Sequence, residues 1–107
     1  MRVACLVLLA FPVFAAGAAP SLEETRQLAA DQGCYNCHGQ PPRRNVPSFR
    51  DIAARYAKYR GRLDAATQQQ LADRLHHGGA FSHVAAHERL TEAQASQLVQ
   101  WLVEGAP

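Results

Sequence analysis

The clearest hydrophobic pattern in the chain lies in residues 48–56. Four apolar residues recur at the i, i+3, i+4 and i+7 spacing of one helix face: Phe49, Ile52, Ala53 and Tyr56. Ser48 can cap such a helix, with Asp51 as its partner three residues later. The basic side chains of the same stretch fall on the opposite face. We therefore predict an amphipathic helix that starts at Ser48 and ends before Gly61.

Three other stretches show the helical period, and no stretch alternates as a β-strand does. One follows Ser21 and its capping partner Glu24, one spans about residues 64–77 before Gly78 and Gly79, and the last opens at Thr91. Their inward rows are Leu22, Thr25, Leu28 and Ala29; Leu71, Ala72 and Leu75; and Ala95, Leu98, Trp101 and Leu102. The pattern predicts an all-α fold of about four helices.

The chemistry of the chain lies between the first two helices, where Cys34, Cys37 and His38 form the spacing C-x-x-C-H. This spacing is typical of c-type haem attachment, in which two thiols bond to the two vinyl groups of one porphyrin. The adjacent imidazole then binds the iron from one face. The motif predicts covalently bound haem c with His38 as a metal ligand, and a Pro-rich loop at residues 39–47 wrapped around the cofactor.

Three other readings of the two cysteines are weaker. A zinc site needs two more ligands, and the nearest histidines, from His76 to His87, lie about 40 residues later without the spacing of a zinc finger. A redox C-x-x-C follows a strand, and none is predicted. A disulfide between Cys34 and Cys37 would leave His38 without a role.

Residues 1–19 have the pattern of a secretory signal peptide, with Arg2, an apolar stretch and small residues at 16–19. The alternative is a membrane anchor, which needs about 20 apolar residues. We therefore predict cleavage, a domain at residues 20–107, export to a periplasm of the Gram-negative type, and no stable membrane insertion afterwards. Cys5 leaves with the signal, so both remaining cysteines belong to a single haem motif.

The chain has a net charge of +2, and its basic residues are unevenly distributed along the sequence. Residues 43–62 contain seven basic side chains, Arg43, Arg44, Arg50, Arg55, Lys58, Arg60 and Arg62, against Asp51 alone. A solvated helix face explains most of this charge, and a docking patch for an acidic redox partner is the alternative. Nucleic acid is a poor candidate partner, because the basic residues are not interleaved with aromatic ones.

Together, the motif and the helices resemble the class I c-type cytochromes, in particular the small bacterial ones. The resemblance rests on a helix ending in Gly-Cys-x-x-Cys-His at residues 33–38 and a Pro-Ser-Phe-x-x-Ile-Ala-x-x-Tyr stretch at residues 47–56. It also includes a helix ending in Gly-Gly and a last helix that carries an aromatic residue. It covers almost all of residues 20–107.

This resemblance implies a small bundle around the haem, in which the first and last helices cross and Trp101 lies against Gly33 and Ala29. It also implies that the backbone carbonyl of Pro47 accepts the Nδ1 proton of His38, which makes Pro47 part of the haem site.

The chain departs from the family at the sixth iron position, which most members fill with a methionine before the last helix. The chain's one methionine is Met1, inside the predicted signal. The loop at residues 80–90 instead carries His83 and His87. Counting back from Thr91 favours His83 as the second axial ligand, and counting forward from Leu75 favours His87. An open sixth position is a further alternative.

These features predict an exported monohaem cytochrome that carries one electron between redox proteins and is not an enzyme. Two imidazole ligands would give it a lower reduction potential than its Met-ligated relatives. The alternative is a module that binds or senses CO, NO or O₂ at an open sixth position. We expect a monomer whose partners are a reductase or an oxidase.

Overall fold

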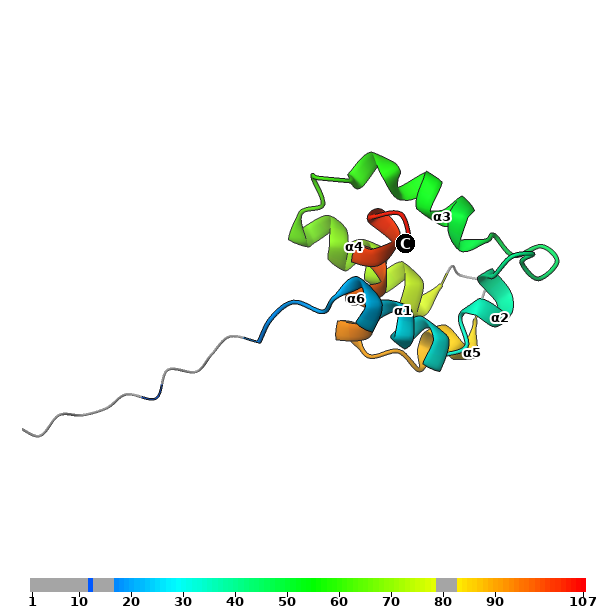
Figure 1. Ribbon diagram of the computed structural model, residues 1–107, viewed down its shortest axis with the longest axis horizontal. Coiled ribbons are helices and arrows are strands. Elements are labelled where there is room, and N and C mark those ends of the chain that lie inside the picture. The colour runs from blue at the N-terminus through cyan, green and yellow to red at the C-terminus, as the bar shows by residue number, and fades with distance from the viewer. Residues whose placement is uncertain (1–11, 13–16, 79–82) are drawn as a thin grey trace, which may run out of the picture.

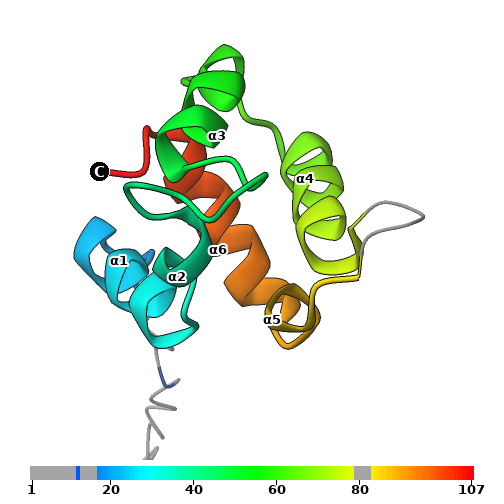
Figure 2. The same ribbon diagram turned by 90° about the vertical axis from the view of Figure 1, so that its right-hand side faces the viewer.

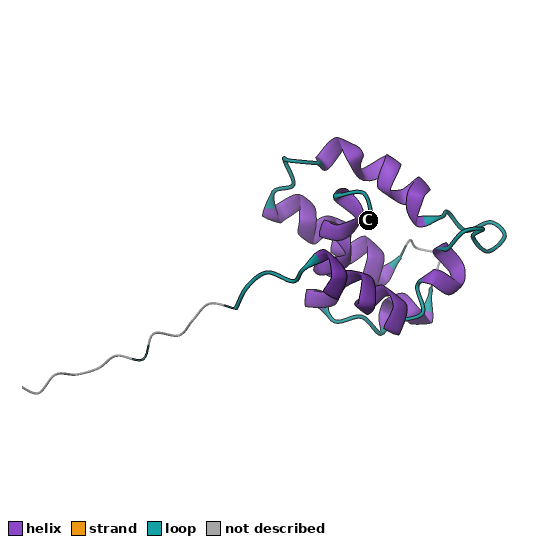
Figure 3. Ribbon diagram, in the orientation of Figure 1, coloured by secondary structure: helices purple, strands orange, loops and turns teal. Residues whose placement is uncertain are grey.

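The computed structural model describes residue 12, residues 17–78 and residues 83–107, and over these ranges the chain is helical without strands (Figures 1 and 3). Most of the predicted signal at residues 1–19 therefore lies outside the described residues. The described elements are α1 (Leu22–Asp31), α2 (Tyr35–His38), α3 (Phe49–Tyr56), the 3₁₀ helix η1 (Ala57–Tyr59), α4 (Ala65–His77), α5 (Ala85–Glu88) and α6 (Glu92–Val103).

The four helices predicted from the hydrophobic period are present as α1, α3, α4 and α6. Three of them begin with the predicted capping boxes, formed by Ser21 with Glu24, Ser48 with Asp51 and Thr91 with Gln94. The helices α2 and α5 were not predicted, because each has four residues and is too short to show a hydrophobic period. The all-α fold is confirmed.

Helix α6 is the centre of the fold. Figure 2 shows it running between α1 and α4, with α3 above it, and it packs against all three. Its buried side chains are Ala95, Leu98, Val99, Trp101, Leu102 and Val103. The rest of the buried cluster comes from Ala29 of α1, Leu71 and Ala72 of α4, and Leu90 just after α5.

The first and last helices pack across each other, as the resemblance implies. Ala29 is fully buried, so the backbones can approach closely at this point. Beside it, the Gln97 amide donates a hydrogen bond of 3.0 Å to the buried hydroxyl of Thr25. The pairing of α1 with α6 fixes the end of α1, which leads directly into the cysteine motif.

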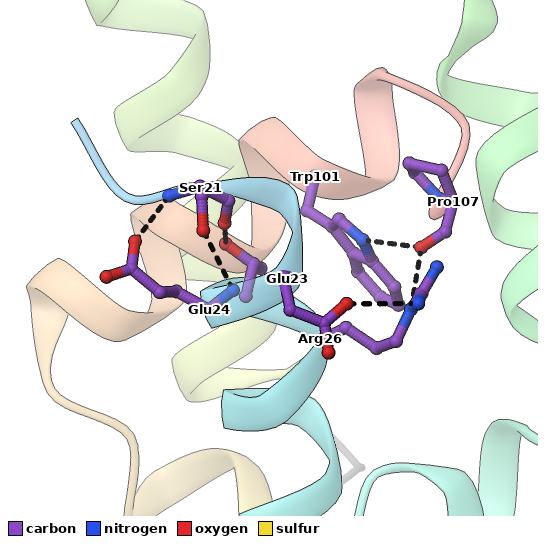
Figure 4. Close-up of polar contacts among 7 residues, drawn as sticks. Ser21, Glu23, Glu24, Arg26, Trp101 and Pro107 are labelled. Carbon is purple, nitrogen blue, oxygen red and sulfur yellow. Dashed lines mark hydrogen bonds and ion pairs between the residues drawn. The ribbon is translucent and has the colours of Figure 1, made fainter.

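Trp101 joins α6 to the chain end and to α3. Its Nε1 donates to the Pro107 carbonyl at 3.2 Å, and the same oxygen accepts a 3.3 Å hydrogen bond from Nε of Arg26 (Figure 4). The edge of its ring meets Phe49, with the ring centres 5.0 Å apart. The expected contact of Trp101 with Gly33 stays a prediction. Apart from its chain neighbours, a Cβ at Gly33 would have Asn36 Nδ2 as its only neighbour within 4 Å among the described residues.

Replacing Trp101 by alanine should lower the free energy of unfolding by about 3–5 kcal/mol, because a fully packed indole is lost from the core. Urea unfolding of the purified protein, followed by circular dichroism, measures the change. The exposed neighbour Gln100→Ala is the matched control on the same helix and should stay within about 0.5 kcal/mol. Equal losses in the two variants would contradict the central position of Trp101.

Candidate haem-binding site

A hydrogen-bonded turn at the end of α1 sets the position of Cys34. Gly33 has a φ of +73°, and its N–H donates to the Ala30 carbonyl at 3.0 Å. The N–H of Cys34 donates to the Ala29 carbonyl at 2.9 Å. These two bonds form a Schellman motif, which needs a residue in the left-handed conformation at the position of Gly33. The glycine is therefore required by the backbone and not by a close helix crossing.

The single turn of α2 brings the three motif side chains to one region. The N–H groups of Cys37 and His38 both donate to the Cys34 carbonyl, at 3.2 and 3.0 Å. Residues three positions apart lie on the same side of a helical turn. The thiols of Cys34 and Cys37 are free, and burial raises the pKa of the Cys34 thiol above its ordinary value. Both thiols are thus available to bond to one porphyrin.

His38 is oriented by the loop that follows it. Its Nδ1 lies 2.6 Å from the Pro47 carbonyl oxygen, which is the hydrogen bond that the resemblance implies. The loop is closed by a 2.9 Å bond from the Arg43 N–H to the Cys37 carbonyl. With the Nδ1 proton donated to Pro47, Nε2 of His38 carries the lone pair that a metal can bind.

The cap of α3 holds the Pro47 carbonyl in place, because the buried Ser48 is the next residue. The Ser48 N–H donates to the Asp51 carboxylate at 3.2 Å, and the Asp51 N–H donates to the Ser48 hydroxyl at 3.1 Å. Hydrogen bonding to Ser48 lowers the pKa of Asp51 below its ordinary value of 3.8. The orientation of His38 therefore depends on a helix cap as well as on its own motif.

His87 lies opposite His38. The centres of the two rings are 6.1 Å apart, and their planes are within 11° of parallel. The two rings are stacked, so His87 brings a second imidazole beside the proposed metal ligand His38. Burial, and then the neighbouring His38, lower the pKa of His87. The lowered pKa favours the neutral ring that a metal ligand requires.

His83 lies in a different environment. Its side chain is 76% exposed, and its Nδ1 is 3.1 Å from the Glu88 carboxylate. His76 and His77 lie at the end of α4 and contact each other, with a ring-centre distance of 4.5 Å. Of the histidines outside the motif, His87 is the one for which the described residues give a ring contact with His38.

Two further residues of the site were not predicted from the sequence. The hydrophobic pattern places Phe49 on the apolar face of its helix, and in the structure its ring centre also lies 5.3 Å from that of His38. Gly39 follows the motif, and a Cβ at this position would lie 2.6 Å from the Tyr35 carbonyl oxygen. The helical period gives no signal for either role, because both depend on how loop and helix meet.

The zinc alternative finds no support in the described part of the chain. Within it, no group of three or more His, Cys, Asp or Glu side chains could hold a metal ion. Two free thiols and an oriented imidazole within one turn are instead the donor set that covalent haem attachment uses.

An all-α fold whose first and last helices pack across each other, with this donor set after the first helix, is that of a c-type cytochrome. The chain is 35% identical over 80 residues to cytochrome c-552 of Hydrogenobacter thermophilus, an alignment that covers 72% of this chain and 76% of that protein. The chain therefore belongs to the c-type cytochrome family, whose cofactor is covalently bound haem c. No family model and no solved structure matches it. In the described ranges, none of the helices is long and apolar enough to cross a membrane.

Replacing Gly33 by alanine should impair haem attachment as well as stability. Gly33 and Gly61 both have a φ of +73°, so alanine at either position should cost about 1–2 kcal/mol of backbone strain. At Gly61 the added Cβ meets no atom within 4 Å, whereas at Gly33 it lies 3.1 Å from Asn36. We expect only Gly33→Ala to lower the yield of covalent haem, measured by haem absorbance per protein after acid–acetone extraction. Equal yields in the two variants would contradict a special role for the Gly33 turn.

The Asp51 cap should show a characteristic dependence on pH. The lowered pKa means that the ionised carboxylate stabilises the folded state above the unfolded pKa, and that this contribution disappears as pH falls through the folded pKa. Asp51→Asn should therefore reduce the free energy of unfolding at pH 7, and the difference from the parent should shrink as pH falls below 3.8. Chemical unfolding between pH 7 and 3 measures this, with Asp73→Asn within α4 as the control. A difference that did not depend on pH would exclude the ionised cap.

Proposed function

We propose that the protein is an electron carrier with one haem c, attached to Cys34 and Cys37 and bound axially by His38 and His87. The single observation that carries the proposal is the pair of near-parallel imidazoles with ring centres 6.1 Å apart. The chain contains one C-x-x-C-H motif, which supports a single haem. The iron of a bound haem supplies the redox change by alternating between its ferric and ferrous states.

His87 is a better candidate for the second ligand than His83, although the count from Thr91 favours His83. The His83 side chain is mostly exposed and beside Glu88, whereas His87 is half-buried and beside His38. The one-turn helix α5 carries His87 and is held by the N–H groups of His87 and Glu88, which donate to the Val84 carbonyl. A ligand on a hydrogen-bonded turn needs little rearrangement when the oxidation state changes.

Similarity to a cytochrome supports electron transfer over catalysis. In such a carrier, the protein holds two axial ligands in both oxidation states and keeps the cofactor from dissociating. The Pro47 carbonyl contributes by keeping the His38 ring in one orientation and one tautomer. We further propose export to the periplasm, on the basis of the signal pattern at residues 1–19, and exchange of electrons with larger redox proteins as the role of such a carrier.

The absorption spectrum of the protein, matured in cells equipped for cytochrome c assembly, tests the proposal. We expect covalent haem with a low-spin ferric spectrum, and a reduced form that does not respond to CO. His87→Ala should convert the iron to a high-spin form that binds CO, while His83→Ala should leave the spectrum unchanged.

Each other outcome has a defined meaning. A change on His83→Ala alone would reverse the ligand assignment, and CO binding by the parent would replace electron transfer with small-ligand binding. A colourless protein in which both thiols react with a thiol reagent would show that no haem is attached, and would overturn the haem assignment.

A further inference from the structure

A groove of about 640 Å³ lies beside His38, between α2, α3 and the chain end. We call it the arginine groove, and its main lining residues are Tyr35, Phe49, Arg50, Ala53, Arg60 and Ala106. A cavity of this size, with an apolar base and a few polar groups at its edge, is typical of a binding site. The haem attachment proposed above uses neither of its arginines.

The groove carries positive charge, and among the described residues no carboxylate lines it. Its lining includes Arg50 and Arg60 and no acidic residue. Among the described residues, neither arginine has a carboxylate within 4 Å. The nearby Asp51 is occupied by its hydrogen bonds with Ser48. An anion that enters the groove would therefore meet two cationic side chains that form no ion pair with a described carboxylate, although the charge of Arg50 also acts on nearby Asp51.

Arg60 is held in place before any ligand binds. Its Nε donates to the Val103 carbonyl at 3.1 Å, which anchors the guanidinium against the end of α6. The terminal nitrogens of the guanidinium remain available for a carboxylate, which arginine binds with two parallel hydrogen bonds. A preorganised side chain loses less conformational entropy on binding than a free one.

The base of the groove is a contiguous set of aromatic rings. The rings of Tyr35 and Phe49 meet edge to face, with centres 5.1 Å apart, and Phe49 makes a similar contact with Trp101. Phe49 also lies 5.3 Å from the ring of His38. His38 itself also lines the groove, so a partner seated on this base would lie beside the proposed metal ligand.

We propose that the arginine groove is the docking site for an acidic segment of the protein's redox partner, with carboxylates on Arg50 and Arg60 and an apolar side chain on the Tyr35–Phe49 base. The proposal rests on the proposed function, since it names where that function's partner binds. Complementary charge would accelerate the encounter, and the apolar base would favour one orientation. The other basic side chains of residues 43–62 would then attract the acidic partner through their long-range electrostatic field.

Binding can be tested without any redox reaction, with hexacyanochromate(III) as a redox-inert paramagnetic anion. In NMR spectra of the ¹⁵N-labelled, reduced holoprotein, we expect this anion to broaden the amides of Gly39, Gln40, Gly105 and Ala106 most strongly. The double variant Arg50→Gln, Arg60→Gln should bind it about tenfold more weakly, because two charge contacts are lost. The control Arg55→Gln, Arg62→Gln removes the same charge from exposed positions outside the groove and should change the affinity about twofold at most.

A second measurement distinguishes a protein segment from a small anion. A peptide of alternating glutamate and leucine should displace hexacyanochromate from the groove, while its glutamine counterpart and malonate at equal carboxylate concentration should not. Equal displacement by malonate would make the groove a small-anion site and overturn the proposal. So would broadening centred away from the groove, or equal weakening in both double variants. The absorption spectrum of the parent separates these failures from failure of the haem assignment, since it reports the axial ligands and not the groove.

Discussion

The packing of α1, α3 and α4 against α6 is the interaction on which the rest of the molecule depends. Most of the buried cluster belongs to α6, and the other helices reach it with only one or two fully buried side chains each. A domain this small has little apolar surface to bury. Concentrating the core on one helix leaves the turns between the other helices available for ligands. The cysteine motif and α5 are two such turns, and each is held by backbone hydrogen bonds.

The candidate site is oriented by three short-range devices, each supported by the helices. A Schellman turn places Cys34, a carbonyl of the following loop orients His38, and a helix cap fixes the residue after that carbonyl. Each device consists of only one or two hydrogen bonds. Together the three devices hold the ligand atoms in place. A redox centre whose ligands move little on oxidation transfers electrons with a low activation free energy. The same local hydrogen bonds therefore stabilise the fold and orient the candidate site.

The two candidate ligands, His38 and His87, are held in place by different parts of the backbone. His38 is hydrogen-bonded to Pro47 across nine residues, whereas His87 is carried by the single helical turn α5. Phe49 contacts His38 and Trp101 together, so one ring links the ligand to the core. The same ring forms part of the base of the arginine groove. Core packing, ligand orientation and the proposed docking surface therefore meet at α3.

The sequence by itself determined the four longer helices and their caps, because periodicity and capping residues are local properties of the chain. It also determined the attachment motif, since covalent chemistry requires the two thiols and the imidazole within five residues. Only the tertiary structure could decide which histidine lies beside His38. His83 and His87 are four residues apart in sequence, and they differ in burial and in their neighbours because of the way α5 packs. The role of Gly33 was decided in the same way, by a backbone angle that no hydrophobic pattern encodes. The groove between Arg50 and Arg60 likewise exists only because α6 brings the chain end beside α3.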